Sequence, residues 1–238
     1  MKSFKGLPAI LFTCLILSQP AFADDYETAS AAAKKGDFPL AVRLLKSLAE
    51  KGDPKAQAEL GGLYLSGSGV PSNVPEGVKW IRLAAEKGLA TAQFNLGSLY
   101  LEGRAVPLDY KAAMTWLLKA AGQNMPEAQL NIASMYFDGE GVTQDYAEAG
   151  KWLKLAAING NAEAQLALAR MYAHGQGVEK DALRAFMWGE IASEKSPMSE
   201  SEKKTIREMA EKALSPEELK EARAMTRKCK ESQLRNCP

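Results

Sequence analysis

The sequence is poor in the side chains on which metal binding and catalysis most often depend. Histidine occurs once, at His174, and cysteine three times in 238 residues. A zinc site needs several His, Cys or carboxylate ligands close together, and a Ser–His–Asp set needs a histidine held between its two partners. One isolated histidine provides neither arrangement. We therefore expect a protein that is not an enzyme, with no catalytic residues, no bound metal and no cofactor.

Strong net charge and long apolar runs are also missing. The formal net charge is +1 at pH 7, and basic residues are dispersed among acidic ones, without the interleaved aromatic residues that nucleic-acid binding favours. The body of the chain has no apolar run long enough to cross a bilayer, so we expect no membrane-spanning helix there. The Gly-x-Gly elements of the sequence follow predicted helices instead of strands, which argues against a phosphate-binding loop.

The N-terminus has the pattern of a secretory signal peptide. Lys2 and Lys5 precede a mostly apolar segment at 7–17 that is too short to span a bilayer. An Ala-Phe-Ala sequence then matches the small-x-small cleavage pattern, which predicts a signal peptide at 1–23 that is removed after Ala23. The alternative is an uncleaved anchor. With cleavage, we expect the mature protein to be periplasmic or secreted.

What the chain does contain is a 36-residue repeat. All of its tryptophans keep this spacing: Trp80, Trp116, Trp152 and Trp188. The same step separates four tyrosines and four glutamines: Tyr64, Tyr100, Tyr136 and Tyr172; Gln57, Gln93, Gln129 and Gln165. A fixed period of this size indicates helical units stacked side by side. We expect the tyrosines and tryptophans to form the repeated core, because they fall at helical spacing among apolar neighbours.

Each full unit reads as helix, loop, helix. In the second unit, Leu96 and Tyr100 fall on one face of a first helix, and Gly103 follows as a residue that adopts a left-handed cap without strain. Asp109 is a suitable N-cap for a second helix, which carries Trp116. The sequence therefore predicts an all-α fold, an α/α superhelical solenoid.

The ends depart from the repeat, as the terminal units of a stacked protein do because one face meets water. We expect a shortened N-terminal capping unit at 24–53, four full units at 54–89, 90–125, 126–161 and 162–196 (together 54–196), and a helical C-terminal cap at 197–238. In the cap, one helix is predicted over 199–214, and Ser215 with Glu218 forms the capping box of another.

Two cysteines, Cys229 and Cys237, lie in the last ten residues. In an exported chain, cysteines this close in sequence usually pair. We therefore expect a disulfide that holds down the C-terminus. Two free thiols are the alternative.

The repeated residues resemble Sel-1-like repeats, a branch of the tetratricopeptide-type α-solenoids. The resemblance rests on AQAELGGLYLSGSGVPSNVPEGVKWIRLAAEKG and its three copies, and it covers residues 54–192 without a gap. The departures are small, with Ala105, Ala133 and Ala169 in place of glycine and Gly77 in place of alanine. The resemblance implies protein–protein interaction, as in adaptors of envelope assembly, signalling regulation or host contact.

We therefore interpret the chain as a non-enzymatic scaffold of the bacterial envelope that binds a protein or peptide partner in a concave groove. First helices line the concave side in solenoids of this type. The predicted binding positions form a polar stripe on these helices: Glu59, Asn95, Ser98, Glu102, Asn131, Ser134, Asp138 and Arg170. We expect Phe94 and Phe137 to add apolar contacts. The alternative is that the stripe is only a wetted helix surface.

A β-lactam-binding or hydrolysing enzyme is the main rival interpretation, because the resemblance extends to a family whose cysteine-rich branch is associated with that activity. That branch carries a cysteine pair in each repeat, and these repeats carry none. Ser201-x-x-Lys204 matches the nucleophile motif of penicillin-binding enzymes, but neither S-D-N nor K-T-G accompanies it. An envelope assembly or regulatory factor is a further alternative.

Overall fold

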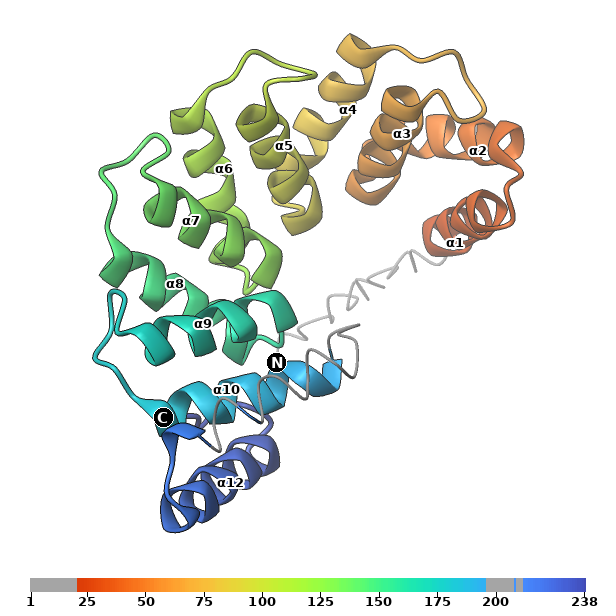
Figure 1. Ribbon diagram of the computed structural model, residues 1–238. Coiled ribbons are helices and arrows are strands. Elements are labelled where there is room, and N and C mark those ends of the chain that lie inside the picture. Colours follow the sequence, from red (N-terminus) through yellow and green to blue (C-terminus); the bar gives the residue numbers. More distant parts are fainter. Residues whose placement is uncertain (1–20, 196–207, 209–211) are drawn as a thin grey trace, which may run out of the picture.

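A computed structural model describes three parts of the chain: residues 21–195, 208 and 212–238. These parts form helices and connecting turns, without a strand, and the helices follow one another along an open arc (Figure 1). The predicted α/α superhelical solenoid is therefore confirmed. Most of the predicted signal peptide and of the predicted helix over 199–214 lies outside the described residues, and so does Ser201 with Lys204.

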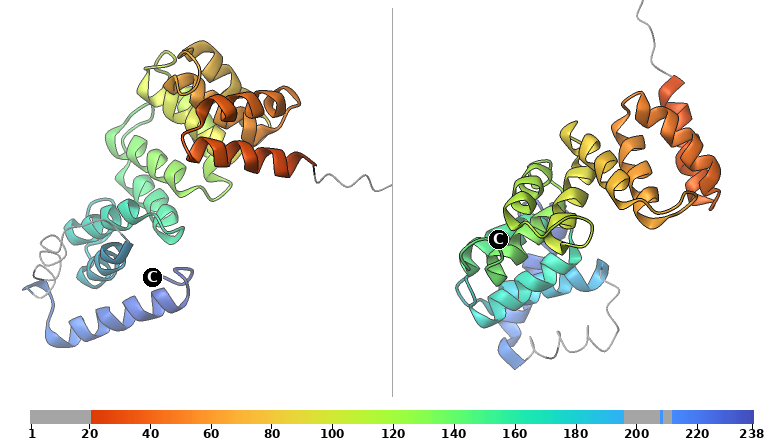
Figure 2. Two further views of the ribbon diagram at one scale, coloured as in Figure 1. Left: turned by 90° about the vertical axis from the view of Figure 1, so that its right-hand side faces the viewer. Right: turned by 90° about the horizontal axis from the view of Figure 1, so that it is seen from above.

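The helices form consecutive pairs, each pair being one unit of the repeat. Their bounds are α1 (Ala21–Lys34), α2 (Phe38–Glu50), α3 (Pro54–Ser66), α4 (Val74–Glu86), α5 (Ala90–Glu102), α6 (Tyr110–Ala121), α7 (Pro126–Asp138), α8 (Tyr146–Ile158), α9 (Ala162–His174), α10 (Ala182–Lys195) and α12 (Pro216–Glu231). Helices α3, α5, α7 and α9 lie on the inner side of the arc, and α4, α6 and α8 on the outer side (Figure 1). Two further views show α1 and α12 at opposite ends of the solenoid (Figure 2). In the described parts of the chain, no helix has the length and apolarity needed to cross a membrane.

Local sequence signals determine where these helices begin and end. The Asp109 carboxylate accepts a hydrogen bond from the Ala112 N–H at 2.9 Å, and Asp145 caps α8 in the same way through the Glu148 N–H. The inner helices end at glycines in the left-handed conformation, with φ between 65° and 75°: Gly67, Gly103, Gly139 and Gly175. A residue with a Cβ resists this conformation, so glycine sets the helix length. The predicted helix–loop–helix unit is confirmed.

The repeated glutamines connect successive units. Each is buried in an inner helix and donates from Nε2 to a carbonyl near the end of the preceding outer helix, at 2.9–3.2 Å: Gln57 to Ala49, Gln93 to Ala85, Gln129 to Ala121 and Gln165 to Ala157. The last carbonyls of a helix have no partner within that helix, and buried polar groups need one. The 36-residue spacing of glutamine therefore follows from the geometry of the unit boundary.

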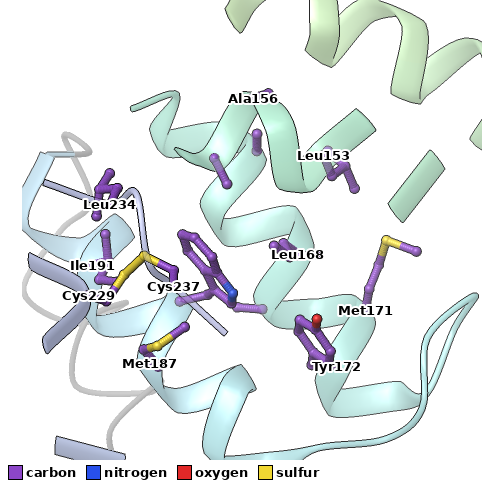
Figure 3. Close-up of a cluster of buried hydrophobic side chains, with 14 of the residues drawn as sticks. Leu153, Ala156, Leu168, Met171, Tyr172, Met187, Ile191, Cys229, Leu234 and Cys237 are labelled. Atoms are coloured by element: carbon purple, nitrogen blue, oxygen red, sulfur yellow. A yellow bond between two sulfur atoms is a disulfide. The ribbon is translucent and has the colours of Figure 1, made fainter. Parts of the chain in front are cut away.

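The C-terminal cap completes the last core cluster. This cluster combines side chains of α7, α8, α9 and α10 with three from the C-terminus (Figure 3): Cys229, Leu234 and Cys237. The two cysteines lie at disulfide distance, with Cα atoms 4.7 Å apart. The predicted capping box of α12 is present, with the Ser215 N–H donating to Glu218 Oε2 at 2.7 Å.

The repeated aromatic residues differ in burial from unit to unit. Trp188 and Tyr172, both beside the cap, are buried. The remaining tryptophans and tyrosines are half-buried at the edges of their clusters: Trp80, Trp116, Trp152, Tyr64, Tyr100 and Tyr136. Lys119 Nζ lies 4.0 Å from the ring centroid of Trp116, so a cation reaches one face of that ring. Only the last tryptophan is enclosed on all sides.

Candidate functional site

The eight predicted binding positions, here called the inner stripe, all lie on inner helices but differ in exposure. Five side chains are exposed: Asn95, Glu102, Ser134, Asp138 and Arg170. Three are half-buried: Glu59, Ser98 and Asn131. The exposed residues come from α5, α7 and α9, whereas α3 contributes only Glu59. The accessible part of the inner stripe therefore begins at the second full unit.

One hydrogen bond joins the inner stripe across a unit boundary. Asn131 Nδ2 of α7 donates to Ser98 Oγ of α5 at 3.4 Å. Helices α5 and α7 are therefore in side-chain contact, and their polar positions adjoin one another. Asn131 has an amide donor engaged within the protein, whereas no hydrogen bond to the Asn95 side chain occurs among the described residues. Asn95 keeps both its donors and its acceptor available to a ligand.

The two phenylalanines expected in the groove pack within the solenoid. Phe94 is half-buried against the cluster that contains Leu117 and Ile132. Phe137 is half-buried and lies edge-to-face on Tyr146, with ring centroids 5.0 Å apart. Burial against neighbouring helices removes apolar surface from water. The inner stripe is consequently a mainly polar surface.

The N-terminal end of the inner stripe is occupied by the chain itself. Tyr26 of α1 forms a side-chain hydrogen bond with Glu59, and Lys55 Nζ lies 5.6 Å from the Tyr26 ring centroid. Burial, together with the negative charge of Glu59, raises the pKa of the Tyr26 hydroxyl to about 12. Sequence reasoning missed this contact because Tyr26 lies in the capping unit, outside the repeat register. The only signal was an aromatic residue in an alanine-rich helix.

Replacing Tyr26 with Phe is expected to remove part of the loss of stability at alkaline pH. The Tyr26 pKa rises from 10.0 to about 12 on folding, so the folded state holds this proton more tightly. The resulting stabilisation is fully present below about pH 10 and is lost as the pH rises through about 12. Thermal denaturation over this range should show a steeper fall in Tm for the natural chain than for Tyr26→Phe. Parallel curves would contradict the assignment, and Tyr110→Phe controls for loss of a hydroxyl group.

Charge along the inner stripe changes from acidic to basic. Glu102 and Asp138 are the last residues of α5 and α7, at the ends of these helices where the helix dipole is negative. Arg104 approaches Glu102 only at 4.0 Å and is 86% exposed, so this ion pair is weak. Arg170 and His174 are exposed on α9. The surface therefore presents acceptors at α5 and α7 and a cation at α9.

The inner stripe offers hydrogen bonds and charge, without a nucleophile paired to a base. Its only neighbouring histidine, His174, is exposed at the end of α9. Within the described ranges, no group of three or more His, Cys, Asp or Glu side chains is placed to hold a metal ion. The geometry is suited to binding a polar chain.

Comparison with known proteins gives one family. A family model described as Sel1 repeat matches five consecutive segments of the chain: residues 29–53, 54–89, 90–125, 126–161 and 162–197. No curated protein sequence matches.

Solved structures show the same architecture. The crystal structure of c5321, a protective antigen present in uropathogenic Escherichia coli strains that displays an SLR fold, has 34% sequence identity and a TM-score of 0.69 over 73% of this chain. The match covers only 38% of that antigen. A Sel1 repeat protein from Oxalobacter formigenes has 33% identity and a TM-score of 0.67, over 72% of this chain and 68% of the other. A sel1 repeat protein from Klebsiella pneumoniae, at 20% identity and a TM-score of 0.51 over 80% and 92%, shares the fold.

Proposed function

Since the chain belongs to the Sel1 repeat family, whose members are typically non-catalytic protein-interaction scaffolds, we propose that it binds an extended segment of a partner protein along the inner stripe. The hydrogen bond between Asn131 and Ser98 is the observation that carries this proposal. It joins the polar positions of two units into a surface that runs along the solenoid. A bound chain would meet α5, α7 and α9 in succession.

Differences between the units support the same surface. The buried position that holds the unit boundary is glutamine in all four units. The position two residues after each of these glutamines, by contrast, varies in chemistry, with a carboxylate, two amides and a methyl group: Glu59, Asn95, Asn131 and Ala167. A residue that packs one unit against the next makes the same contact in every unit. A residue that binds a ligand contacts a different part of that ligand in each unit. Variation along the inner stripe is therefore expected of a surface that recognises a sequence.

The polar groups of the inner stripe fit an extended polypeptide. A peptide that is not paired in a sheet has free N–H and C=O groups, and the Asn95 amide can satisfy one of each. The Ser134 hydroxyl can do the same at α7. Glu102 and Asp138 suit a basic side chain, and Arg170 suits a carboxylate. The order of these charges along the inner stripe would favour a partner segment whose own charges follow the complementary order.

We place this binding in the bacterial envelope, in the periplasm or outside the cell. Cleavage after Ala23 would leave Asp24 and Asp25 at the start of α1, where acidic residues stabilise a helix. The proximity of Cys229 to Cys237 favours an oxidising compartment. The N-terminal residue of protein recovered from the periplasm, and alkylation of both cysteines only after reduction, would test the location. Free alkylation without reduction would contradict it.

The binding proposal is tested by cross-linking in living cells followed by mass spectrometry of the captured partner. The test variant is Asn95→Ala/Ser134→Ala, and the matched control is Lys111→Ala/Thr115→Ala on the exposed side of α6. Loss of two hydrogen-bonding groups at about 1 kcal/mol each predicts capture reduced by about tenfold or more for the test variant. The control should capture as the natural chain does. Equal capture by both variants, with unchanged Tm, would rule out the inner stripe.

A further inference from the structure

A second surface lies on the C-terminal cap, away from the inner stripe. Helix α12 buries one face, which includes Ala222, Thr226 and Cys229, against the rest of the protein. Leu234 and Cys237, which follow it, are buried in the cluster around Trp188. The helix is therefore anchored, and its outward side chains have a defined orientation.

The outward side of α12 carries four basic residues in a row, here called the basic flank: Lys220, Arg223, Arg227 and Lys230. Their spacing of three, four and three residues places them on one side of the helix. At 1.5 Å per residue they extend over about 15 Å. Basic residues that are dispersed among acids in the sequence are therefore gathered on one flank in the fold. Arg235, also exposed, follows beyond Lys230.

Three residues of the basic flank form no ion pair among the described residues. On other helices an acidic residue three positions earlier pairs with the basic one, as in Lys79 with Glu76 and Lys151 with Glu148. In the parts of the chain that the structure describes, no ion pair forms at Lys220, Arg223 or Arg227, all of which are exposed.

Like charges lie at helical spacing along α12, and neither Glu217, three residues before Lys220, nor Glu231, four after Arg227, forms an ion pair with them in the described residues. Arg223 lies three residues after Lys220 and four before Arg227, a spacing that destabilises a helix when the charges have the same sign. The helix nevertheless keeps this arrangement, with only Lys230 neutralised through an ion pair with Glu194 of α10. An external anion would relieve the repulsion. A bound acidic ligand would therefore stabilise the basic flank.

The basic flank leads into a hollow of about 600 Å³ beside α10. Its apolar lining comes from Ile158, Ile191 and Leu234. Its charged lining consists of Glu194, which is already paired with Lys230, and of Lys230 and Arg235, so the charge left unpaired is basic. Figure 3 shows Ile191 and Leu234 side by side next to the cysteine pair. A hollow of this kind accepts an apolar side chain from a ligand whose acidic groups follow the basic flank.

We propose that the basic flank and this hollow form a second binding surface, for an acidic protein segment that carries an apolar side chain. A membrane surface fits less well, because an interfacial helix inserts an apolar face and that face of α12 is buried in the cap. The large exposed apolar side chains of the described residues lie elsewhere: Val74, Leu108, Leu118 and Leu155. The surface is distinct from the inner stripe and does not depend on the function proposed for it.

Fluorescence anisotropy with a labelled glutamate-rich peptide ending in leucine tests this proposal on the full chain at low ionic strength. Arg223→Gln/Arg227→Gln should weaken binding by about tenfold or more, because each charge-assisted contact is worth more than a neutral hydrogen bond. The matched control is Lys228→Gln/Lys111→Gln, which removes the same charge and includes the residue next to Arg227 on the opposite flank. This control should change the Kd by less than about twofold.

A second peptide ending in serine should bind more weakly if the hollow takes the apolar side chain. The Asn95→Ala/Ser134→Ala variant should bind the glutamate-rich peptide as the natural chain does, which separates this surface from the inner stripe. No binding of the peptide to the natural chain would overturn the proposal. So would equal losses in the two charge variants, or binding to phosphatidylglycerol vesicles without binding to the peptide.

Discussion

Trp188→Ala is expected to lower the free energy of unfolding by about 3–5 kcal/mol, the largest effect among the four tryptophans. Trp188 is fully buried between α9, α10 and the C-terminal segment. Removing its ring leaves a cavity that Leu234 and Cys237 cannot fill without moving the cap. Urea denaturation followed by far-ultraviolet circular dichroism measures the loss. Hydrogen exchange should place it in α9, α10 and α12, because units of a solenoid are stabilised mainly by their neighbours.

Trp116→Ala is the matched control for this prediction. The ring of Trp116 is half-buried, and Lys119 lies over one of its faces. Less apolar surface returns to water on truncation, so we expect roughly half the loss seen at Trp188. If both variants lost the same stability, the cap would add nothing to the packing of Trp188.

Gly141→Ala is expected to lower the free energy of unfolding by about 2–5 kcal/mol. Gly141 has φ +71°, a conformation that costs roughly 1–2 kcal/mol in a residue with a side chain. A Cβ there would also clash with the Tyr110 Cβ, far inside ordinary van der Waals contact, so the loop or the start of α6 must shift. Such overpacking adds about 1–3 kcal/mol. Thermal and urea denaturation of the purified variant would measure the total.

Gly88→Ala separates the two contributions. Gly88 has a similar φ of +88°, but nothing lies within 4 Å of a Cβ built on it. We therefore expect Gly88→Ala to show only the conformational cost of roughly 1–2 kcal/mol. Equal losses at Gly88 and Gly141 would show that the loop yields without strain.

The Gly141 contact also explains a departure from the repeat. Gly69, Gly141 and Gly177 each lie against the first residue of the preceding outer helix, and that residue is aromatic in all three cases: Phe38, Tyr110 and Tyr146. In the second unit the loop has Ala105, and the corresponding helix begins with the smaller Val74. Ala105 is not among the residues with positive φ, so this loop takes a different path. In this unit, the loop glycine and the aromatic residue against which it would lie are therefore both replaced.

The order and type of the helices could be predicted because their signals are local. A capping Asp109 or a left-handed Gly103 acts on residues within one turn of itself, and the 36-residue period repeats these signals. The binding surface was less accessible to the same reasoning. The positions of the inner stripe follow from helical spacing, but the contact of Asn131 with Ser98 and the cover of Tyr26 over Glu59 depend on how neighbouring helices are placed.

The sequence by itself determined the repeat, the helix boundaries and the family to which the chain belongs, because each depends on short-range spacing. Only the tertiary structure decided which equivalent residues differ in role. Trp116 and Trp188 have the same register, yet only Trp188 is enclosed, since Leu234 and Cys237 reach it from the end of the chain. Burial depends on contacts between distant segments, and a spacing pattern contains no information on those contacts.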